Sequence, residues 1–339
     1  MANVTVVIPL YNKGPYILQA LRSVAQQRCQ DFEVVVVDDG STDNGAELAE
    51  NYPDSRFRVI RQKNAGPGAA RNRGIAETRT PLVAFLDADD EWMPEYLETA
   101  VRAFEENREL GCLTQGFFDE PGMRRSQAVW SRRGVRDGIQ AMEGQTPLSL
   151  HYLVAYINSQ ATVAQTELVR KWGGFYENRC LYGEDSFLWL KFLLREQVGL
   201  SMRETMAIHR EASGLNFPGM KKARPIEPYL EHPEELLEIC PSHLLPLLRN
   251  FFALRAFKTA CVLGYYGQWQ RAAELRRKFR QPGDHRIPWY FSSWVCSTPI
   301  GAGLGMAWRA LNTVRGRPTE QGANAASPAA KADRVTAAQ

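Results

Sequence analysis

Five aspartates in two short runs are the residues of this chain whose type and spacing most clearly could do chemistry. Asp38 and Asp39 follow the apolar stretch FEVVVV, and Asp87, Asp89 and Asp90 follow the stretch LVAFL. Carboxylates gathered at one place repel one another, and a hard divalent cation relieves that repulsion. The pattern therefore predicts a Mn²⁺ or Mg²⁺ ion. Because such ions keep coordination positions open for phosphate oxygens, the pattern also predicts that the ion binds a nucleotide diphosphate.

Each acidic run also has a simpler interpretation. Asp39-Gly40-Ser41 alone is typical of a turn and helix cap. The run from Asp87 to Asp90, which precedes Met93 and Pro94, could merely begin a helix. The placement of both runs after apolar stretches favours the metal interpretation over either cap.

The elements that must position these residues alternate between strand and helix. Strands are predicted at residues 4–8, 32–37, 57–60 and 82–86, and helices around residues 17–25, 45–52 and 69–78. Continuous β-branched runs indicate strands buried on both faces, so the pattern predicts a doubly wound, mostly parallel α/β sheet. Ligands of such sheets bind beyond the carboxyl ends of the strands, which is where PLYNK, DDGSTD and DADDEW lie.

The pattern is less regular after Asp119. An apolar segment at 148–157, a strand about 161–164, a helix that opens near Glu184 and a strand at 202–209 are expected. Four prolines after Leu215 predict a linker: Pro218, Pro225, Pro228 and Pro233. Amphipathic helices are predicted at 243–263 and 269–279. Residues 317–339, rich in Ala and poor in large apolar side chains, are expected to be a disordered tail.

Five motifs in series resemble the successive signatures of family 2 glycosyltransferases. They are PLYNK at 9–13, VVDDGSTD at 36–43, NAGPGAARNRGI at 64–75, FLDADD at 85–90 and YGEDSFLWLK at 182–191. The resemblance covers about residues 1–215, which it implies are a catalytic domain of the type A fold, followed by a basic, helical, Trp-rich region at 216–316. It implies transfer of a sugar from a nucleotide-diphospho-sugar with inversion at the anomeric carbon.

The resemblance also implies roles for residues near the donor. Pro9 and Tyr11 match the segment beside the nucleotide base, and Asp39 matches the aspartate that accepts a hydrogen bond from the uracil imide. Asn64 and Arg71 match positions near the base and phosphates. Tyr11 could instead be an ordinary surface residue, and Arg71 an ordinary cation on a helix surface.

DADD matches the family's DxD motif, and its carboxylates are the expected metal and ribose ligands. Asp89 is the expected metal ligand, with Asp87 or Asp90 as its partner, because neighbouring carboxylates point in different directions and the loop geometry decides. His209 falls where some relatives place a further metal or phosphate contact. A polar residue at a strand end is the alternative for His209.

Glu184-Asp185 resembles the family's catalytic pair, in which the aspartate is the general base. Inversion requires the acceptor hydroxyl to attack from the face opposite the diphosphate, so the base belongs on the acceptor side. The alternative is that Glu184 and Asp185 are only helix N-terminal charges. Trp172-Gly173-Gly174-Phe175 matches a segment expected to shape the acceptor or sugar pocket.

Charge and composition limit the possible partners. The chain of 339 residues has a net charge of +3, too near neutral to favour nucleic acid. Residues 249–317 hold twelve basic and two acidic residues, so this region could face an anionic membrane surface. Residues 287–308 carry no charge, and they could span a membrane, lie at its interface through their tryptophans, or pack in a helical subdomain.

The six cysteines and the N-terminus indicate the compartment. The cysteines are widely spaced without a CxxC pair, which favours reduced thiols over a zinc site or a disulfide framework. MANVTVVIPLYNK lacks a basic leader followed by a long apolar core, so no secretion signal is expected. A cytoplasmic location, peripheral on the inner face of the membrane, is predicted.

The leading prediction is a metal-dependent hexosyl- or N-acetylhexosaminyl-transferase in cell-surface polysaccharide or glycoconjugate synthesis. Its donor would be a UDP-sugar and its acceptor a hydroxyl of a glycan or lipid-linked molecule. A transferase to polyprenyl phosphate is the second enzyme hypothesis, disfavoured by the retained Glu184-Asp185 pair. A non-catalytic sugar-nucleotide-binding subunit of a polysaccharide assembly complex is the third, and it would be expected to have lost the acidic residues. An oxidoreductase is disfavoured because no G-x-G-x-x-G follows the first strand.

Overall fold

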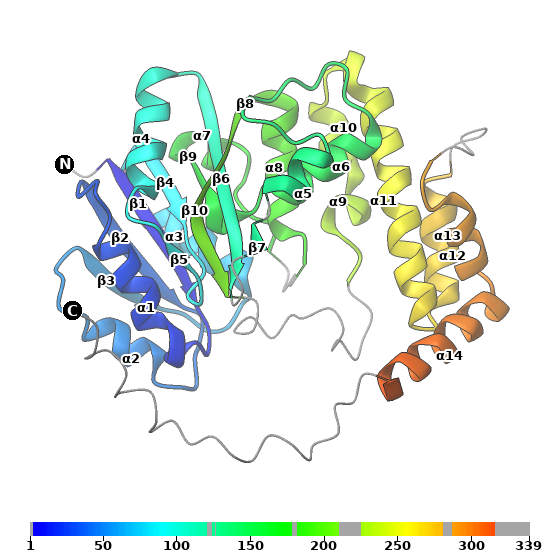
Figure 1. Ribbon diagram of the computed structural model, residues 1–339, viewed down its shortest axis with the longest axis horizontal. Helices are drawn as coiled ribbons and strands as arrows, with labels where there is room; N and C mark the ends of the chain where they lie inside the picture. Colours follow the sequence, from blue (N-terminus) through cyan, green and yellow to red (C-terminus); the bar gives the residue numbers. More distant parts are fainter. Residues whose placement is uncertain are drawn as a thin grey trace, which may run out of the picture.

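The computed structural model describes residues 3–120, 124–125, 127–177, 182–209, 225–280 and 287–315. An α/β part with a single large sheet occupies the blue-to-green half of the chain, and helices make up the rest (Figure 1). The tail at 317–339 and residues 210–224, which include the first part of the linker predicted after Leu215, lie outside the described residues. The later part of that linker is helical, since Pro228 and Pro233 each begin a short helix.

The first half of the α/β part follows the predicted alternation. Its elements are β1 (Val4–Leu10), α1 (Gly14–Ala25), β2 (Phe32–Asp38), α2 (Gly45–Glu50), β3 (Phe57–Arg61), α3 (Pro67–Glu77) and β4 (Leu82–Phe85). One difference is that β1 runs through Pro9, which pairs with Val37 in parallel register, instead of ending there. Asp38 is likewise the last residue of β2, because its backbone still pairs with Leu10 and Arg61.

The second half is less regular and contains elements that the sequence pattern did not indicate. Its elements are β5 (Glu91–Trp92), α4 (Tyr96–Glu106), β6 (Leu110–Glu120), β7 (Arg124–Arg125), α5 (Gln127–Arg132), β8 (Gly138–Ile139), α6 (Pro147–Tyr156), β9 (Thr162–Gln165), α7 (Thr166–Lys171), α8 (Glu184–Arg195) and β10 (Gln197–His209). The predicted apolar segment, strand and helix correspond to α6, β9 and α8. Strand β6 and helix α4 were missed.

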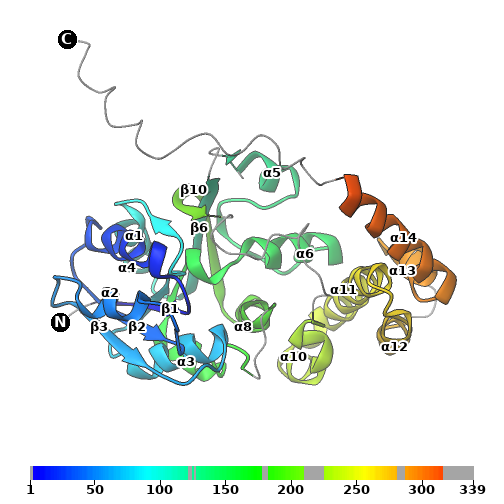
Figure 2. The same cartoon turned by 90° about the horizontal axis from the view of Figure 1, so that it is seen from below.

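The strands form one ten-stranded sheet whose order is β3-β2-β1-β4-β9-β6-β10-β5, with β7 beside β6 and β8 beside β10. The four strands from β3 to β4 are parallel, and β9 then runs antiparallel between β4 and β6. Helices α1 and α4 cover one face and α3 and α8 the other (Figures 1 and 2). The predicted doubly wound α/β sheet is thus confirmed.

The topology explains why the polar loops meet. The chain leaves β1 toward β2 and β3 and later returns to place β4 on the opposite side of β1. This reversal is the switch point at which the loops after parallel strands diverge and leave room for a ligand. The loops after β1, β2 and β4 carry PLYNK, DDGSTD and DADD, respectively.

The helical C-terminal region begins after residue 225. Its elements are α9 (Pro228–Glu231), α10 (Pro233–Ile239), a 3₁₀ turn at Ser242–Leu244, α11 (Leu245–Tyr265), α12 (Trp269–Lys278), α13 (Tyr290–Cys296) and α14 (Pro299–Arg315). Helix α11 packs against α6 of the α/β part as well as against α12, α13 and α14. Among the described residues, none of the helices combines the length and the apolar character needed to cross a bilayer.

The same hydrophobic core extends from the sheet into this helical region. Buried side chains of β1 and β4 belong to one contiguous cluster with Leu236, Leu248 and Phe251. None of the five described cysteines forms a disulfide, and two of them, Cys112 and Cys240, are buried, while Cys180 lies outside the described residues.

Candidate functional site

The loops after β1 and β2 are bonded to each other at the edge of the sheet. Asn12, which adopts a left-handed backbone conformation (φ 52°), accepts hydrogen bonds at Oδ1 from the backbone N–H (2.7 Å) and the hydroxyl (3.2 Å) of Thr42. Its own N–H donates to the Ser41 hydroxyl at 3.0 Å. Asp38 accepts from the Ser41 N–H at 3.0 Å, which makes it a turn residue of this loop. Tyr11, between these contacts and β1, is 49% exposed and therefore open to a ligand.

Asp39 holds the loop that leads into α3. Its carboxylate accepts from the backbone N–H of Ala65 at 2.9 Å and of Gly66 at 2.8 Å, and from the Gln62 amide at 2.8 Å. The Asn64 side chain completes this link by donating to the Asp39 carbonyl at 2.9 Å. Asp39 is buried, and each of its oxygens already has a protein donor. Any hydrogen bond from a uracil imide would use a second lone pair of this carboxylate.

Arg71 joins two acidic motifs that lie far apart in the sequence. Its guanidinium donates to Asp87 Oδ1 at 2.8 Å and to Glu184 Oε1 at 3.0 Å, and it lies 5.3 Å from the centre of the Phe175 ring. Arg71 is buried, so it is not the surface cation that was the alternative interpretation. The charges of its acidic neighbours raise its pKa and outweigh the opposing effect of burial. One buried cation therefore holds the DADD loop against the start of α8.

Asp185 lies beside this ion pair in the first turn of α8. Its Oδ1 accepts from the backbone N–H of Ser186 at 2.7 Å. Burial raises the pKa of the Asp185 carboxyl, the charge of Glu184 raises it further, and Arg71 opposes both. A helix N-terminal charge with no other role would have its pKa lowered by the helix dipole. The raised pKa instead suits a general base near neutral pH.

Asp89 forms an ion pair with Lys13 of the PLYNK loop, with 2.6 Å between Nζ and Oδ2. Burial raises the pKa of the Asp89 carboxyl, the nearby Asp87 raises it further, and Lys13 opposes both. Two carboxylates close enough to perturb each other are hard oxygen donors of the kind that Mn²⁺ and Mg²⁺ bind. Within the described ranges, no group of three or more His, Cys, Asp and Glu side chains could hold a metal. The residues thus fit a metal that takes one or two protein carboxylates and completes its shell from a ligand and water.

Asp90 is engaged in a hydrogen bond with the backbone at the end of β10. Its carboxylate accepts from the backbone N–H of His209 at 2.9 Å and so ties the DADD loop to the end of β10. The His209 ring contacts Glu91 Oε1 at 2.6 Å. Asp90 is buried, and this bond gives it a part in holding the loop.

The Gly173-Gly174-Phe175 segment docks on α3. Both glycines have positive φ, and the Asn72 side chain accepts from the Phe175 N–H and donates to its carbonyl, each at 2.8 Å. Gly68 permits this close approach, since a Cβ there would lie 2.2 Å from the carbonyl oxygen of Tyr176. The segment thereby places the Phe175 ring against Arg71.

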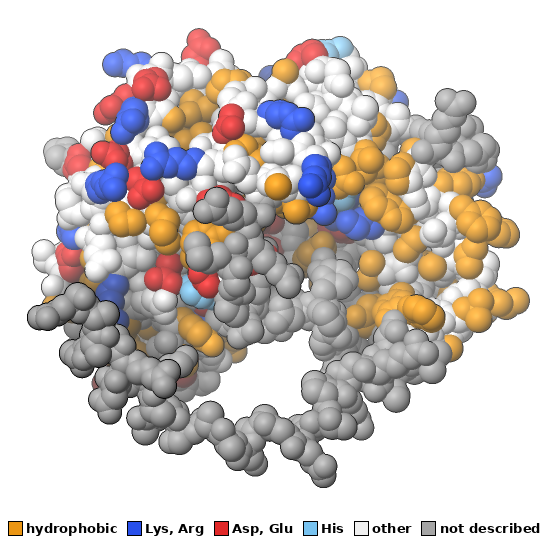
Figure 3. Space-filling model, viewed as in Figure 1, with side chains coloured by type: hydrophobic (Ala, Val, Ile, Leu, Met, Phe, Trp, Pro, Cys, Tyr) orange, Lys and Arg blue, Asp and Glu red, His pale blue; other side chains and the backbone are white. Residues whose placement is uncertain are grey.

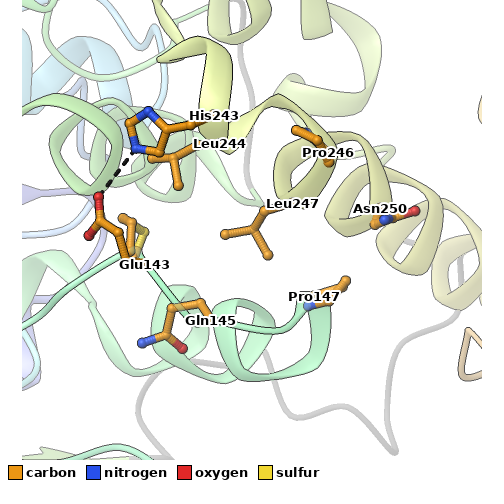
Figure 4. Close-up of a pocket in the computed structure, with 10 residues that line it drawn as sticks. Glu143, Gln145, Pro147, His243, Leu244, Pro246, Leu247 and Asn250 are labelled. Carbon is orange, nitrogen blue, oxygen red and sulfur yellow. Dashed lines mark hydrogen bonds and ion pairs between the residues drawn. The ribbon is translucent and has the colours of Figure 1, made fainter.

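A cavity of about 420 Å³ lies elsewhere, between the start of α6 and the start of α11 (Figure 4). Its lining includes Gln145, Pro147, Leu247 and Asn250, and His243 and Glu143 face each other across its edge at 3.2 Å. None of the residues that line it belongs to the five motifs. The acidic cluster, and not this cavity, therefore remains the candidate catalytic centre.

Comparison with known proteins shows what the first half of the chain is similar to. Residues 5–159 match the family model of Glycosyl transferase family 2. This part of the chain is therefore similar to family 2 glycosyltransferases. It is 38% identical over 122 residues to EpsH of Bacillus subtilis, a match that covers 35% of this chain and 36% of EpsH. It is 47% identical over 110 residues to the succinoglycan biosynthesis protein ExoW of Rhizobium meliloti, covering 30% of this chain and 34% of ExoW. The matches thus span about a third of the length of these curated relatives.

Solved structures show the same fold over nearly the whole chain. S. aureus TarS 1–349 in complex with UDP-GlcNAc aligns with a TM-score of 0.59 and 19% identity, covering 91% of this chain and 92% of the TarS 1–349 chain. The mannosyltransferase PcManGT of Pyrobaculum calidifontis, in complex with GDP-Man and Mn²⁺, aligns with a TM-score of 0.54 and 17% identity, covering 91% of this chain and 87% of PcManGT. At these identities the likeness concerns the fold alone. It confirms the expected α/β fold of the glycosyltransferase type A kind with a helical C-terminal region.

The structure thus brings some predicted residues together and leaves others apart. Arg71, Asp87, Glu184, Asp185 and Asp89 form one cluster. Asp39 and Asn64 form a second group through their own hydrogen bonds, and Pro9 lies within β1. Lys13 lies in the PLYNK motif, but the sequence does not indicate its contact with Asp89, because a single lysine after a strand gives no signal of its partner.

Proposed function

We propose that this chain is a metal-dependent, inverting glycosyltransferase that moves a hexosyl or N-acetylhexosaminyl group from a UDP-sugar to a hydroxyl of a glycan or lipid-linked acceptor. The observation that carries the proposal is the buried Arg71, which holds a DADD carboxylate against Glu184, the neighbour of Asp185. A chain that used these acids only as turns and caps would not need to bury a cation between them. The relative ExoW, a succinoglycan biosynthesis protein, favours a place in polysaccharide synthesis.

In the proposed reaction, Asp185 is the general base. The acceptor oxygen forms a bond to the anomeric carbon while the bond from that carbon to the phosphate oxygen breaks. The electron pair leaves with the diphosphate, and the hydroxyl proton goes to a carboxylate oxygen of Asp185. Because burial and Glu184 raise its pKa, Asp185 is a stronger base than an exposed aspartate and can accept this proton more readily.

The remaining cluster residues hold the donor. Asp89 and Asp87 would hold Mn²⁺ or Mg²⁺, which when bound neutralises charge on the diphosphate. Arg71 fixes Asp87, and Lys13 fixes Asp89, in the absence of that charge. The nucleotide base of the donor would contact Tyr11, Asp39 and Asn64, since the loops that carry these residues meet beside β1 and β2.

Two other functions would not require a general base at the position of Asp185. A non-catalytic sugar-nucleotide-binding subunit would not need a carboxyl whose pKa is raised beside the donor site. A transferase to polyprenyl phosphate would need no hydroxyl base, because its acceptor oxygen is already ionised. The environment of Asp185 therefore favours the hydroxyl acceptor over both.

Nucleotide binding is the first test of the donor class. Calorimetric titration with UDP, GDP, CDP and dTDP, each with and without Mn²⁺, is expected to show metal-dependent binding of UDP. Asp89→Ala should weaken that binding by about tenfold or more, because it removes a proposed metal ligand. Glu98→Ala, which removes an exposed carboxylate on α4, is the matched control and should bind UDP normally. Binding that ignores both the metal and Asp89 would contradict the proposal.

The C-terminal helices are proposed to lie on the inner face of the cytoplasmic membrane. Exposed hydrophobic side chains gather over α13 and α14, with between 44% and 78% of each exposed: Phe291, Trp294, Ile300, Leu304, Met306 and Trp308. Figure 3 shows hydrophobic side chains over the helical part of one face. Basic residues stand close by in the sequence, in α12 and just after it: Arg271, Arg277, Lys278 and Arg280. Aromatic rings beside basic residues are typical of segments at a lipid interface.

Vesicle binding tests this surface. The chain is expected to co-sediment with phosphatidylglycerol vesicles at 50 mM salt and to be released as the salt approaches 0.5 M, because the Debye length shortens. Replacing both Trp294 and Trp308 by Ser should reduce the bound fraction severalfold. Val129→Ser, which removes an exposed apolar side chain from α5, should leave the bound fraction unchanged. Equal binding of wild type and the tryptophan variant would refute the surface.

A further inference from the structure

Outside the acidic cluster, the chain buries a second pair of a carboxylate and an arginine, Glu227 at the start of α9 and Arg255 of α11. Arg255 donates to Glu227 Oε1, and the Thr259 hydroxyl donates to Glu227 Oε2 at 2.8 Å. The Glu227 carbonyl accepts from the backbone N–H of Leu230 at 2.8 Å and of Glu231 at 3.2 Å. The side chain of Glu227 is therefore fixed by α11, and its backbone is fixed by α9.

The orientation of Glu227 is what this pair provides beyond stability. Burial removes water from both charges, so apolar side chains of similar volume often stabilise a fold as well as a buried ion pair does. A carboxylate that accepts charge-assisted and neutral hydrogen bonds from two fixed donors is, however, held in one orientation. The segment against which the Glu227 side chain is held is the turn before α8.

Glu227 packs against this turn at Gly183. A Cβ added to Gly183 would lie 3.4 Å from Cγ of Glu227 and 3.7 Å from Cδ of Pro228, which leaves room for no more than a methyl group between the two segments. Helix α8 also packs against α9 and α10, and α11 packs against α9. The helical region thus covers the turn directly.

Tyr182, the other residue of the turn, lies close to the same buried pair. Burial lowers the pKa of Arg255, but the nearby Tyr229, Glu227 and Tyr182 raise it by more. Arg255 also contacts His151 Nδ1 at 2.8 Å. Burial and nearby cations lower the pKa of His151 to about 3, so its imidazole is neutral and leaves the charge of Glu227 as the counter-charge of Arg255.

The position of Asp185 depends on how this turn is held. Gly183 is the N-cap residue of α8 in a left-handed conformation (φ 79°), and it has no side-chain oxygen to accept from the first N–H groups of the helix. Arg71 of α3 holds the start of α8 through Glu184 at 3.0 Å. Figures 1 and 2 show α8 between α3 on one side and α10 and α11 on the other. Glu227 therefore supports the start of α8 from the side of the helical region.

We propose that Glu227 is a positioning residue for Asp185, and that Arg255 and Thr259 act through it. The proposal rests on the proposed function, because Asp185 is the general base of that reaction. Glu227 acts by holding the turn at Gly183, and not by contact with the sugar. In this way the C-terminal helical region keeps the base buried at the start of α8.

The change in Tm caused by Asp185→Asn reports whether Asp185 keeps its buried environment. Burial raises the pKa of Asp185 to about 7, with the charges of Glu184 and Asp87 raising it further and Arg71 opposing them, so Asp185→Asn should raise Tm at pH 8. In Glu227→Gln, a looser turn would admit water and weaken the effect of burial. Asp185→Asn added to Glu227→Gln should therefore raise Tm at pH 8 by less than half as much as it does in the wild-type chain.

A purely structural role would not give this result. A variant that only weakens the fold lowers Tm with and without Asp185→Asn alike, and leaves the effect of Asp185→Asn unchanged. The matched control is Ser293→Ala in α13, which removes a buried hydroxyl that accepts from Arg276 Nε at 3.0 Å. If Glu227→Gln does not fold, Thr259→Val takes its place, because it removes one hydrogen bond of Glu227 and keeps the size of the side chain.

Turnover gives a second readout of the same variant. Displacing a catalytic group by about 1 Å can reduce turnover by about 10²-fold. Glu227→Gln should lower kcat by about tenfold, measured as UDP release, and leave KM for the UDP-sugar within about twofold, because the proposed donor contacts lie on other loops. A rise in KM with unchanged kcat would contradict a positioning role for the base.

Two further results would overturn the proposal. They are an effect of Asp185→Asn on Tm that is as large in Glu227→Gln as in wild type, and an equal reduction of that effect by Ser293→Ala. Failure of the proposed base gives a different result. If Asp185→Asn does not raise Tm at pH 8 in the wild-type chain, the assignment of the base fails and this inference fails with it, whereas a rise that persists in Glu227→Gln removes only the positioning role.

Discussion

Asp185→Asn is expected to reduce sugar transfer by about 10²- to 10⁴-fold while leaving UDP binding within about twofold of wild type. The amide retains the shape of the carboxyl and its place in the first turn of α8, but it cannot take the acceptor proton. Turnover is measured as UDP release in the presence of acceptor, and binding by calorimetry with Mn²⁺. Glu98→Gln, on the exposed face of α4, is the matched carboxylate control and should keep full turnover.

The pH dependence of turnover distinguishes a general base from a carboxyl that only supports the structure. The pKa of Asp185 is raised to about 7, so turnover should rise with pH through this value as the carboxyl loses its proton. The charge of Glu184 contributes to the shift, so Glu184→Gln should move the rising limb to lower pH. A limb that stays in place in this variant, or normal turnover in Asp185→Asn, would show that another group is the base.

Loss of the Asp185 proton, which is expected to raise turnover, is expected to lower the stability of the fold. The folded pKa of Asp185 lies above the ordinary value of 3.8, so folding favours the protonated form. Its contribution to stability is fully present below about pH 4 and is lost as the pH rises through about 7. Asp185→Asn should therefore raise Tm at pH 8 and change it little at pH 4. A catalytic loss with a gain in stability distinguishes this residue from one that only supports the fold.

The first half of the sheet could be predicted from the sequence because its strands are buried on both faces. Runs such as VTVVI and FEVVVV have no competing helical period, and the turn residues that follow them mark the edge where ligands bind. Strand β6 was missed for the opposite reason. Its sequence, LGCLTQGFFDE, includes two glycines and polar residues, and its place in the sheet comes from pairing with β9 and β10. Long-range pairing of this kind outweighs local propensity.

The sequence predicts the site residues that lie within a motif, but it does not predict the contacts between residues of different motifs. The acids of DADD and Glu184-Asp185 could be found from spacing and resemblance. That Arg71 joins them could not, since the three segments meet only through the fold.

Arg71 should be the residue of this cluster on which folding depends most strongly. Arg71→Met removes the cation but leaves Asp87 and Glu184 facing each other and Asp185 beside them, so it should lower the free energy of unfolding by about 3–5 kcal/mol. Urea unfolding at pH 7.5 measures the change. Arg73→Met, in the same helix, removes an exposed cation that pairs with Glu77 and should cost less than about 1 kcal/mol.

A second variant separates lost charge pairing from lost packing at Arg71. If uncompensated charge causes the instability, Glu184→Gln added to Arg71→Met should restore part of the lost free energy, since fewer carboxylates then remain without a cation. If the packing of the guanidinium against Phe175 dominates, the double variant should be no more stable than Arg71→Met. Lowering the pH toward 5 should also rescue Arg71→Met, because it protonates Asp185, whose pKa is raised to about 7 by burial and the charge of Glu184. Rescue by both routes would show that this arginine permits three acids to share one buried place, which is the arrangement that the proposed base requires.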